Sequence, residues 1–282
     1  ALMFDGSNDY LTFDPSGASS TPDLYCISYW AKRTAFGGTN VNVIAGGSSG
    51  YEDILRYKTD ALEFTINGGP GGELQTNAVF RDPTAWHHVF VKYDSANGTA
   101  GNRMRMFVNG AEVTSFATDS NPSSGLDSNL LDGAIIAVGA YPDGSQNFSG
   151  YLVDLIVTDN GNESVTDFGE YDSDTGIWVP KDPSTLTFGG NSFWLAFDDA
   201  SFATYGVGKD SSGRNNHFTP VSMGANNIVV DNCANSTTKQ VTLYPSIDPS
   251  TQNGGTLSNN NLTYDVGGGS NYALGNFYVS SG

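Results

Sequence analysis

Apolar residues in this chain occur in short runs that either alternate with polar residues or stay apolar for a few positions. Runs of this kind, bounded by Gly, Pro, Asn, Asp and Ser, are typical of β-strands. No segment combines helical periodicity with capping residues over a useful length. The pattern predicts strands at residues 1–4, 10–13, 25–32, 41–45, 54–58, 61–66, 86–93, 103–108, 112–116, 134–140 and 151–158.

The strongest single signal is the stretch from Trp86 to residue 113. Its two apolar-rich runs are followed by the pair Asn109-Gly110. Asn-Gly adopts positive φ at little cost, and in this setting it predicts a β-hairpin. Alternate side chains of the second run share one face, which we expect to pack against another sheet: Met104, Met106 and Val108.

The chain divides into three parts by composition. Residues 1–160 form a strand-rich block, whereas residues 161–230 are irregular around a short apolar run at 193–197. Residues 231–282 are rich in Asn and Ser, with isolated strand-like runs at 241–244 and 261–266. The third part has too few apolar residues for a core of its own, so we expect a tail or the lead-in to a further domain.

The net charge of the chain limits the kinds of partner that it is expected to bind. The chain has 12 Lys and Arg against 30 Asp and Glu, a net charge of −18 at pH 7. An acidic surface repels phosphate, so neither nucleic acid nor an anionic membrane is expected as a partner. Acidity suits calcium binding, because Ca²⁺ prefers carboxylate and carbonyl oxygens. The alternative is that the excess of acidic residues only keeps a secreted or particle-borne protein soluble.

Cysteine and hydropathy patterns exclude further classes. Cys26 lies inside an apolar run and is expected to be a buried small hydrophobe, with a disulfide to Cys233 as the alternative. The two cysteines have no zinc-type spacing. No run reaches the roughly 18 apolar residues of a membrane span, and the first residues lack the pattern of a signal peptide.

Five segments in order resemble the laminin-G-like group of concanavalin A-type lectin folds. They are residues 2–11, 27–32, 86–94 with Asn109-Gly110, 138–140 and 148–157. The resemblance implies an all-β, two-sheet jelly-roll sandwich over residues 1–160, with an irregular, β-containing C-terminal extension.

One segment departs from the usual order of that family. Residues 193–199 and 209–218 match a Trp-containing strand and an Asp-Ser-Ser-Gly stretch that family members often carry before the opening hairpin. Because domain termini tend to lie close together, a strand can come from the other end of the chain. We therefore expect residues 193–197 to pack on or beside the N-terminal hairpin; a partial second domain is the alternative.

Residues 176–181, 186–191 and 209–213 carry a second, narrower resemblance, to structural proteins of marine tailed bacteriophages. There this stretch follows a laminin-G-like domain and precedes another domain, for which residues 275–282 would be the lead-in. The resemblance implies a virion component that contacts other virion subunits, forms homo-oligomers and is located on the extracellular particle.

Catalytic motifs are weak. The glucanase branch of the fold uses a Glu-x-Asp-x-x-Glu strand, and Glu52, Asp53 and Glu63 do not reproduce that alternation. His87 and His88 have no nucleophile motif nearby and match the fold pattern of the family. We do not expect an enzyme.

A calcium site is one candidate for chemistry. Asp5, Asn8 and Asp9 cluster in one turn, and Asp154 interrupts an apolar run, where a buried carboxylate needs a partner. The resemblance places Asp154 near the opening hairpin. The alternative is that these side chains accept hydrogen bonds from turn amides. Asp172 begins an EF-hand-like run without its glutamate, so a plain Asx turn is expected.

Glycan binding is the second candidate. Sugars stack on exposed aromatic rings that have Asn, Asp and Gly beside them. Aromatic residues in turn-rich segments are candidates, with ordinary packing as the alternative: Tyr51, Tyr141, Trp178 and Tyr205.

The sequence thus favours a phage virion structural protein (tail fibre, spike or capsid decoration) that binds host surface glycans. A secreted bacterial carbohydrate-binding or adhesion module is the first alternative, and an unrecognised glycoside hydrolase the second.

Overall fold

The computed structural model describes residues 1–47, 50–199, 205–229, 256–258 and 263–265. Contacts divide the chain into two units, residues 1–238 and 239–282. The second unit contains β18 (Thr256–Ser258) and β19 (Thr263–Asp265), which pair antiparallel. β19 lies within the run predicted at 261–266. Cys233 and the runs predicted at 241–244 and 275–282 lie outside the described residues.

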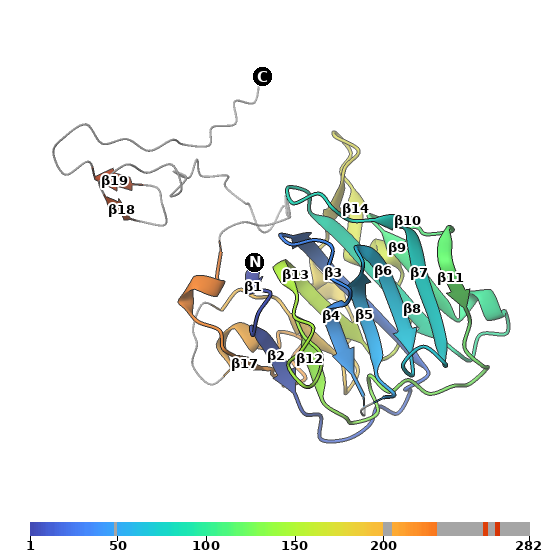
Figure 1. Cartoon of the computed structure of the whole chain (residues 1–282). Helices are drawn as coiled ribbons and strands as arrows, with labels where there is room; N and C mark the ends of the chain where they lie inside the picture. The colour runs from blue at the N-terminus through green and yellow to red at the C-terminus, as the bar shows by residue number, and fades with distance from the viewer. Residues whose placement is uncertain (48–49, 200–204, 230–255, 259–262, 266–282) are drawn as a thin grey trace. The chain divides into compact units, whose positions relative to one another are not determined.

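One sheet of the first unit, here called sheet A, has the strand order β1-β13-β3-β8-β9-β10, with every neighbouring pair antiparallel (Figure 1). Its strands are β1 (Leu2–Asp5), β13 (Ser149–Thr158), β3 (Leu24–Arg33), β8 (His87–Asp94), β9 (Met104–Val108) and β10 (Ala111–Glu112). A seventh strand, β16 (Phe193–Leu195), pairs with β13.

The other sheet, sheet B, has the order β11-β7-β6-β5-β4-β12-β2-β17 and faces the viewer in Figure 1. Its strands are β11 (Phe116–Ser120), β7 (Gly72–Val79), β6 (Ala61–Ile66), β5 (Asp53–Lys58), β4 (Val41–Gly46), β12 (Ile136–Val138), β2 (Tyr10–Phe13) and β17 (Thr219–Val221). A short 3₁₀ turn, η1 (Ala100–Asn102), precedes β9.

One continuous apolar cluster fills the space between the sheets. Successive side chains of a strand point to opposite faces, so each strand sends alternate residues inward. Tyr57 of β5 and Phe64 of β6 lie in this cluster together with Met104 and Met106, and Val108 packs against it, as the alternation predicts. The all-β, two-sheet concanavalin A-like sandwich expected from the sequence is confirmed.

A second apolar cluster lies on the outer face of sheet A. There Trp30, Phe90 and Val153 are covered by Phe168 and Trp178. The covering segment contains α1 (Val165–Phe168), β14 (Gly169–Tyr171), β15 (Trp178–Pro180) and η2 (Pro183–Thr185), and β14 pairs with β15. The irregular composition of residues 161–190 did not predict this cover. Cys26 belongs to the same cluster and is a buried free thiol.

The strand pattern differs from the prediction at several places: β14, β15 and β17 are not predicted, and two further differences concern β7 and residues 112–116. The pattern does not predict β7, whose Leu74 stands between Glu73 and Gln75. The strand predicted at 112–116 is wrong, because β10 ends at Glu112 and β11 begins at Phe116. β11 is an edge strand with a bulge and few apolar residues, so it carries little of the signal that identifies buried strands.

The displaced Trp-containing segment forms β16 and pairs with residues 155–157 of β13. β1 pairs with residues 149–152 of the same strand, so β1 and β16 follow one another along β13. After η3 (Gly206–Gly208), the Asp210 carboxylate accepts hydrogen bonds from the backbone of Trp194, Ser212 and Asn216. The chain then passes through β17 and η4 (Ala225–Asn227) to Ile228, which bridges Leu2.

Candidate functional site

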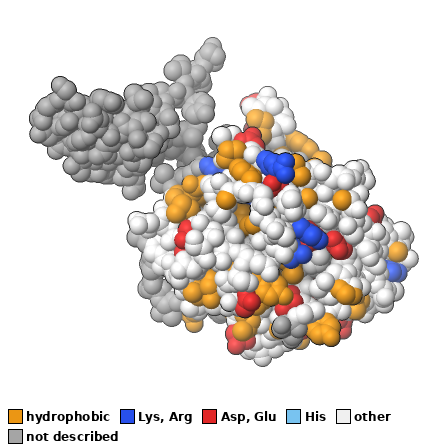
Figure 2. Space-filling view, in the orientation of Figure 1, with side chains coloured by type: hydrophobic (Ala, Val, Ile, Leu, Met, Phe, Trp, Pro, Cys, Tyr) orange, Lys and Arg blue, Asp and Glu red, His pale blue; other side chains and the backbone are white. Residues whose placement is uncertain are grey.

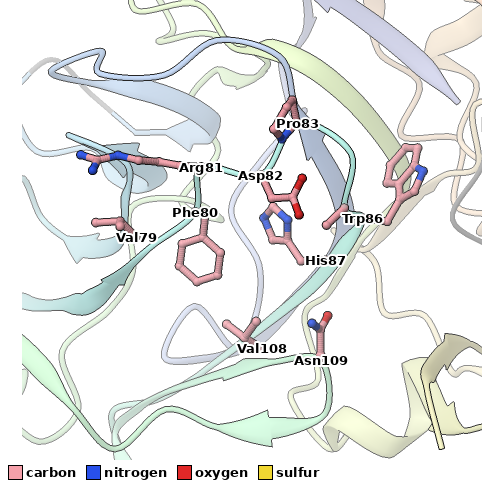
Figure 3. A pocket seen from close by; sticks show the side chains of 10 residues that line it. Val79, Phe80, Arg81, Asp82, Pro83, Trp86, His87, Val108 and Asn109 are labelled. Atoms are coloured by element: carbon pink, nitrogen blue, oxygen red, sulfur yellow. The ribbon is translucent and has the colours of Figure 1, made fainter.

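A groove of about 610 Å³ opens at the rim of the sandwich, beside the Asn-Gly hairpin. It lies between the end of β7, the loop that leads into β8, and the turn after β9. Figure 3 shows the side chains that line it: Val79, Phe80, Arg81, Asp82, Pro83, Trp86, His87, Val108 and Asn109.

Aromatic rings form the floor of the groove. The rings of Phe80 and His87 stack with centroids 5.1 Å apart, and His87 Nε2 shares a hydrogen bond with the Tyr57 hydroxyl. Burial, with the nearby Arg33 charge, lowers the pKa of His87 to about 4. The floor is therefore uncharged at neutral pH.

An ion-pair network fixes the loop that forms one wall. The buried Arg33 guanidinium donates to Phe80 O at 2.7 Å and to the Asp60 carboxylate at 2.9 Å, and Arg81 Nε donates to the same carboxylate at 2.7 Å. Burial alone would raise the pKa of Asp60, but hydrogen bonds from Arg81, Gly37 and Arg33 outweigh it and lower that pKa. The backbone at Phe80 and Arg81 is thus held by buried charges rather than by a regular strand.

The opposite wall is the Asn109-Gly110 turn. Asn109 has φ +49°, and its Oδ1 accepts from His88 N at 2.8 Å. Gly110 has φ +79°, and a Cβ there would lie 2.5 Å from the Trp178 ring. Only glycine fits that contact, so the hairpin and the β15 tryptophan fix each other's position.

Trp178 is held on its other side by His88. Trp178 Nε1 donates to His88 Nδ1 at 3.1 Å, so the His88 proton is on Nε2 and donates to Ser28 Oγ at 2.8 Å. Burial, helped by His87, lowers the pKa of His88 to about 3. His88 is a neutral structural residue, as the family pattern predicts.

Polar groups edge the groove. Asp82 is exposed, and hydrogen bonds from the Thr84 hydroxyl and amide lower its pKa. Trp86 is half-buried, with Lys32 Nζ 5.4 Å from its ring centroid. A carboxylate at Asp82 and a side-chain amide at Asn109 therefore edge the groove, whereas the Trp86 ring points away from it (Figure 3) and packs with Tyr151 on the outer face of sheet A.

The predicted calcium residues make hydrogen bonds within the protein. Asp5 Oδ1 accepts from Ser7 N and Asn8 N, at 2.7 and 3.3 Å. Asp9 Oδ2 accepts from Asp5 N at 3.2 Å and from Asn227 Nδ2 at 2.6 Å. Burial raises the pKa of Asp9, although the Asn227 hydrogen bond opposes the shift.

Asp154 lies apart from that turn, at an irregularity of β13 where its φ is +45°. Its Oδ1 accepts from Trp194 Nε1 at 2.9 Å. Across the part of the chain that the structure describes, no three His, Cys, Asp or Glu side chains form a group that could hold a metal ion. The structure therefore does not bring Asp154 together with Asp5, Asn8 and Asp9.

The four predicted glycan residues lie in different surroundings. Trp178 is only 6% exposed and its ring is packed between His88 and Gly110, so it does not offer a free face. Tyr51 is exposed, Tyr141 is half-buried and Tyr205 stacks on His217 at 4.6 Å. The structure does not bring the four together. The Asx turn expected at Asp172 is present, since its carboxylate accepts from Asp174 N and Thr175 N.

Sequence reasoning missed the groove because its walls come from two segments that are apart in the sequence, residues 79–87 and 108–109. Trp86 and Asn109 stood out in the sequence, but as markers of the fold. Phe80 and Asp82 follow β7, a strand that the pattern did not predict. Asp82 and Asn109 beside an aromatic ring are the residue types sought for sugar binding, and only the fold shows that they meet.

A laminin-G-type family model, described as the concanavalin A-like lectin/glucanases superfamily, matches residues 5–160. The match spans more than half of the chain. The chain belongs to this superfamily. Membership accounts for the two-sheet sandwich and for the order of the motifs in it. No curated protein matches the sequence. Within the described residues, no helix is long and apolar enough to cross a membrane.

Solved structures with a similar fold share little sequence. A SAP-like pentraxin from Limulus polyphemus is 16% identical, with a TM-score of 0.42, and the match covers 56% of this chain and 75% of that one. Mouse laminin α1 domains LG4-5 are 17% identical, with a TM-score of 0.41, and the match covers 55% of this chain and 41% of that one. A Bacteroides ovatus protein proposed to bind carbohydrate is 16% identical, with a TM-score of 0.43, and the match covers 78% of this chain and 59% of that one. The proposals below rest on this chain's own residues.

Proposed function

We propose that the protein is a non-catalytic, lectin-like module that binds a surface glycan in the rim groove. The observation that carries the proposal is the meeting of the Phe80 ring with Asp82 and Asn109 in one groove. An aromatic ring packs against the apolar face of a pyranose, a carboxylate accepts hydrogen bonds from its hydroxyls, and a side-chain amide donates to them. Superfamily membership is consistent with carbohydrate binding and does not name the sugar.

The setting that we propose is a phage virion, as part of a tail fibre, spike or capsid decoration. Support comes from the resemblance of residues 176–191 and 209–213 to phage structural proteins and from the displaced strand β16. In this setting the chain contacts other virion subunits as a homo-oligomer. Light scattering after size-exclusion chromatography tests this setting. We expect an oligomer, whereas a monomer that binds saccharide would favour the secreted bacterial module.

A glycan array tests the binding itself. The wild-type chain is compared with Asp82→Ala and with the control Asp119→Ala, which removes an exposed carboxylate from β11. We expect at least one glycan to bind wild type and control equally, and to bind Asp82→Ala about tenfold more weakly, the effect of one charged hydrogen bond. Absence of binding to every glycan would contradict the proposal.

Cleavage is measured on the same glycans, to separate a lectin from a hydrolase. We expect the recovered saccharide to have its original length. Shortened products that disappear when a carboxylate is replaced would instead establish a glycoside hydrolase.

A further inference from the structure

The β14–β15 hairpin ends in an exposed tip, residues 170–177, that lies outside the apolar cluster beneath the hairpin. The hairpin projects from the sandwich in Figure 1, and Figure 2 shows hydrophobic and acidic surface at this projection. Tyr171 pairs with the buried Trp178, so Ile177 lies on the opposite face of the hairpin, where it is 63% exposed. Tyr171 is itself 58% exposed. Two large apolar side chains that meet solvent at a projecting turn indicate an interaction surface.

The hairpin tip is held in one conformation by its own hydrogen bonds. The Asp172 carboxylate accepts from Asp174 N at 3.1 Å and from Thr175 N at 2.8 Å. At the base of the tip, the Tyr171 hydroxyl donates to Asn109 O at 3.2 Å and joins the hairpin to the Asn-Gly turn. A partner would therefore order few further groups of the tip on binding, which lowers the entropic cost of association.

The charge of the hairpin tip limits what can bind it. Residues 170–177 contain three carboxylates and neither lysine nor arginine. The Glu170 carboxylate lies 3.7 Å from Lys181 Nζ. Asp174 is exposed and accepts from the neighbouring Ser173 Oγ at 3.4 Å, so its carboxylate is accessible to a cation of another chain. The tip is thus complementary to a surface that combines apolar or aromatic groups with a positive charge.

Such a surface lies on this chain, on the outer face of sheet A. Met3, Tyr151 and Lys32 are neighbours in the register of β1, β13 and β3, and the Trp86 ring packs with Tyr151 at 6.4 Å between centroids. Lys32 Nζ lies 5.4 Å from the Trp86 ring centroid and 4.8 Å from that of Tyr151. All four residues are half-buried. They form what is here called the Trp86 patch, an aromatic surface around one ammonium group.

The hairpin tip and the Trp86 patch flank the same groove. Trp86 and Asn109 both belong to its lining, and Asn109 O accepts the hydrogen bond from Tyr171 (Figure 3). Because tip and patch lie at the same rim, a twofold axis near the groove places the tip of each copy on the patch of the other. Such a contact closes after two chains, and both pairs of surfaces are buried at once.

We propose that two copies of this chain form a twofold dimer in which the hairpin tip of each copy docks on the Trp86 patch of the other. There Ile177 packs against the Trp86 and Tyr151 rings. Asp174 pairs with Lys32 of the other copy. The chain has 30 Asp and Glu against 12 Lys and Arg, so copies repel one another over most of their surface, and a contact that brings a carboxylate to a lysine is favoured. The inference deepens the proposed homo-oligomer and is independent of glycan binding in the groove.

Charge reversal on each side tests the contact, with assembly measured by sedimentation velocity over a range of concentrations. We expect the wild-type chain to form dimers. Lys32→Glu and Asp174→Lys each place like charges in both contacts of a dimer, and each should weaken it by about tenfold or more. An equimolar mixture of the two variants should recover the wild-type affinity, because both contacts of the mixed dimer again pair opposite charges.

Two further variants complete the test. Ile177→Ser removes the apolar side chain of the tip and should also weaken the dimer. The control Asp119→Lys reverses an exposed carboxylate on β11 and should leave it unchanged. Asp174 and Ile177 are exposed, so their variants test the contact even if Lys32→Glu does not fold.

Three results would overturn the inference. They are a wild-type monomer at every concentration, an oligomer that neither Asp174→Lys nor Ile177→Ser weakens, and folded single variants whose mixture does not recover the dimer. The second result would leave the homo-oligomeric setting intact and place its contact elsewhere. Failure of the proposed glycan binding is read on the array, and it would leave the dimer and its response to charge reversal unchanged.

Discussion

The two outer faces of the sandwich differ in what covers them. On sheet A, Trp30 and Phe90 are covered by α1, β14 and β15, which add a second apolar cluster. On sheet B, Arg56, Lys58 and Glu63 form an ion-pair cluster whose edge reaches solvent. The hydrophobic effect holds the first arrangement, and hydrogen-bonded charge holds the second. The covered part of sheet A is therefore closed to ligands, and the rim groove is left open.

Removing the central side chain of the cover should have the largest effect. Trp178→Ala deletes a ring that is 6% exposed and packed against His88 and Gly110. We expect a loss of about 3–5 kcal/mol in the free energy of unfolding, measured by urea denaturation. The control Tyr171→Ala, on the same hairpin but exposed, should cost much less. Equal effects would mean that the cover contributes little to stability.

Acid should weaken the fold through the two buried histidines. The pKa of His87 is lowered to about 4 and that of His88 to about 3, against 6.5 for a free histidine. Below pH 6.5 the unfolded chain takes up protons that the folded chain does not, so stability falls as pH falls. Each histidine contributes about 1.4 kcal/mol per pH unit until its folded pKa is reached.

Three carboxyls oppose this trend, because burial raises the pKa of Asp9, Asp53 and Glu73, and Asp53 has the largest effect. Burial raises the pKa of Asp53 to about 6 although four hydrogen bonds, from Ser128, Asn67, Leu130 and Asn129, favour its ionised form. Its contribution to stability therefore grows as pH falls from 6 to 3.8, and it cancels about one histidine. Denaturation at pH 7, 6, 5 and 4 should still give a falling curve, less steep in His88→Asn. A curve that rises toward pH 4 would contradict the assignment of buried neutral histidines.

On sheet B, breaking the charge cluster should cost less than breaking the apolar cover. Glu63→Gln leaves Arg56 and Lys58 without their shared carboxylate, but both cations lie partly in solvent and can hydrate. We expect a loss of roughly 1–3 kcal/mol in urea denaturation. A loss as large as that of Trp178→Ala would mean that the two faces are held equally strongly.

The smallest expected effect concerns calcium. Asp9 is bonded to the Asn227 amide and Asp154 to the Trp194 indole, so neither carboxylate depends on a cation. Thermal unfolding should have the same midpoint with calcium and with a chelator. A rise of several degrees with calcium would show that a site forms at Asp5, Asn8, Asp9 and Asp154 after all.

Local signals explain what the sequence could predict. Asn109-Gly110 specifies its hairpin by backbone preference alone, and alternation in the following strands places Met104 and Met106 in the core. β7 was missed because polar residues flank Leu74. Trp178 was taken for a glycan residue because sequence spacing does not reveal that Gly110 and His88 enclose its ring.

The candidate site was less predictable than the fold for the same reason. Phe80, His87 and Asn109 meet only after β7, β8 and β9 are in place. A buried ion pair between Arg33 and Asp60 holds the Phe80 backbone, and no sequence motif predicts that pair. Residue types suited to sugar binding are common in turns. Their convergence is a property of tertiary structure.

The central claim is that the rim groove binds glycan while the covered face of sheet A does not, and the side-chain N–H signals of Asn109 and of the tryptophans test it most directly. These are followed by NMR as the glycan selected on the array is added. The account predicts that the Asn109 amide signals shift with saturation, and that Trp178 and Trp194, bonded to His88 and Asp154, keep their positions. A shift of Trp178 with no change at Asn109 would contradict the claim.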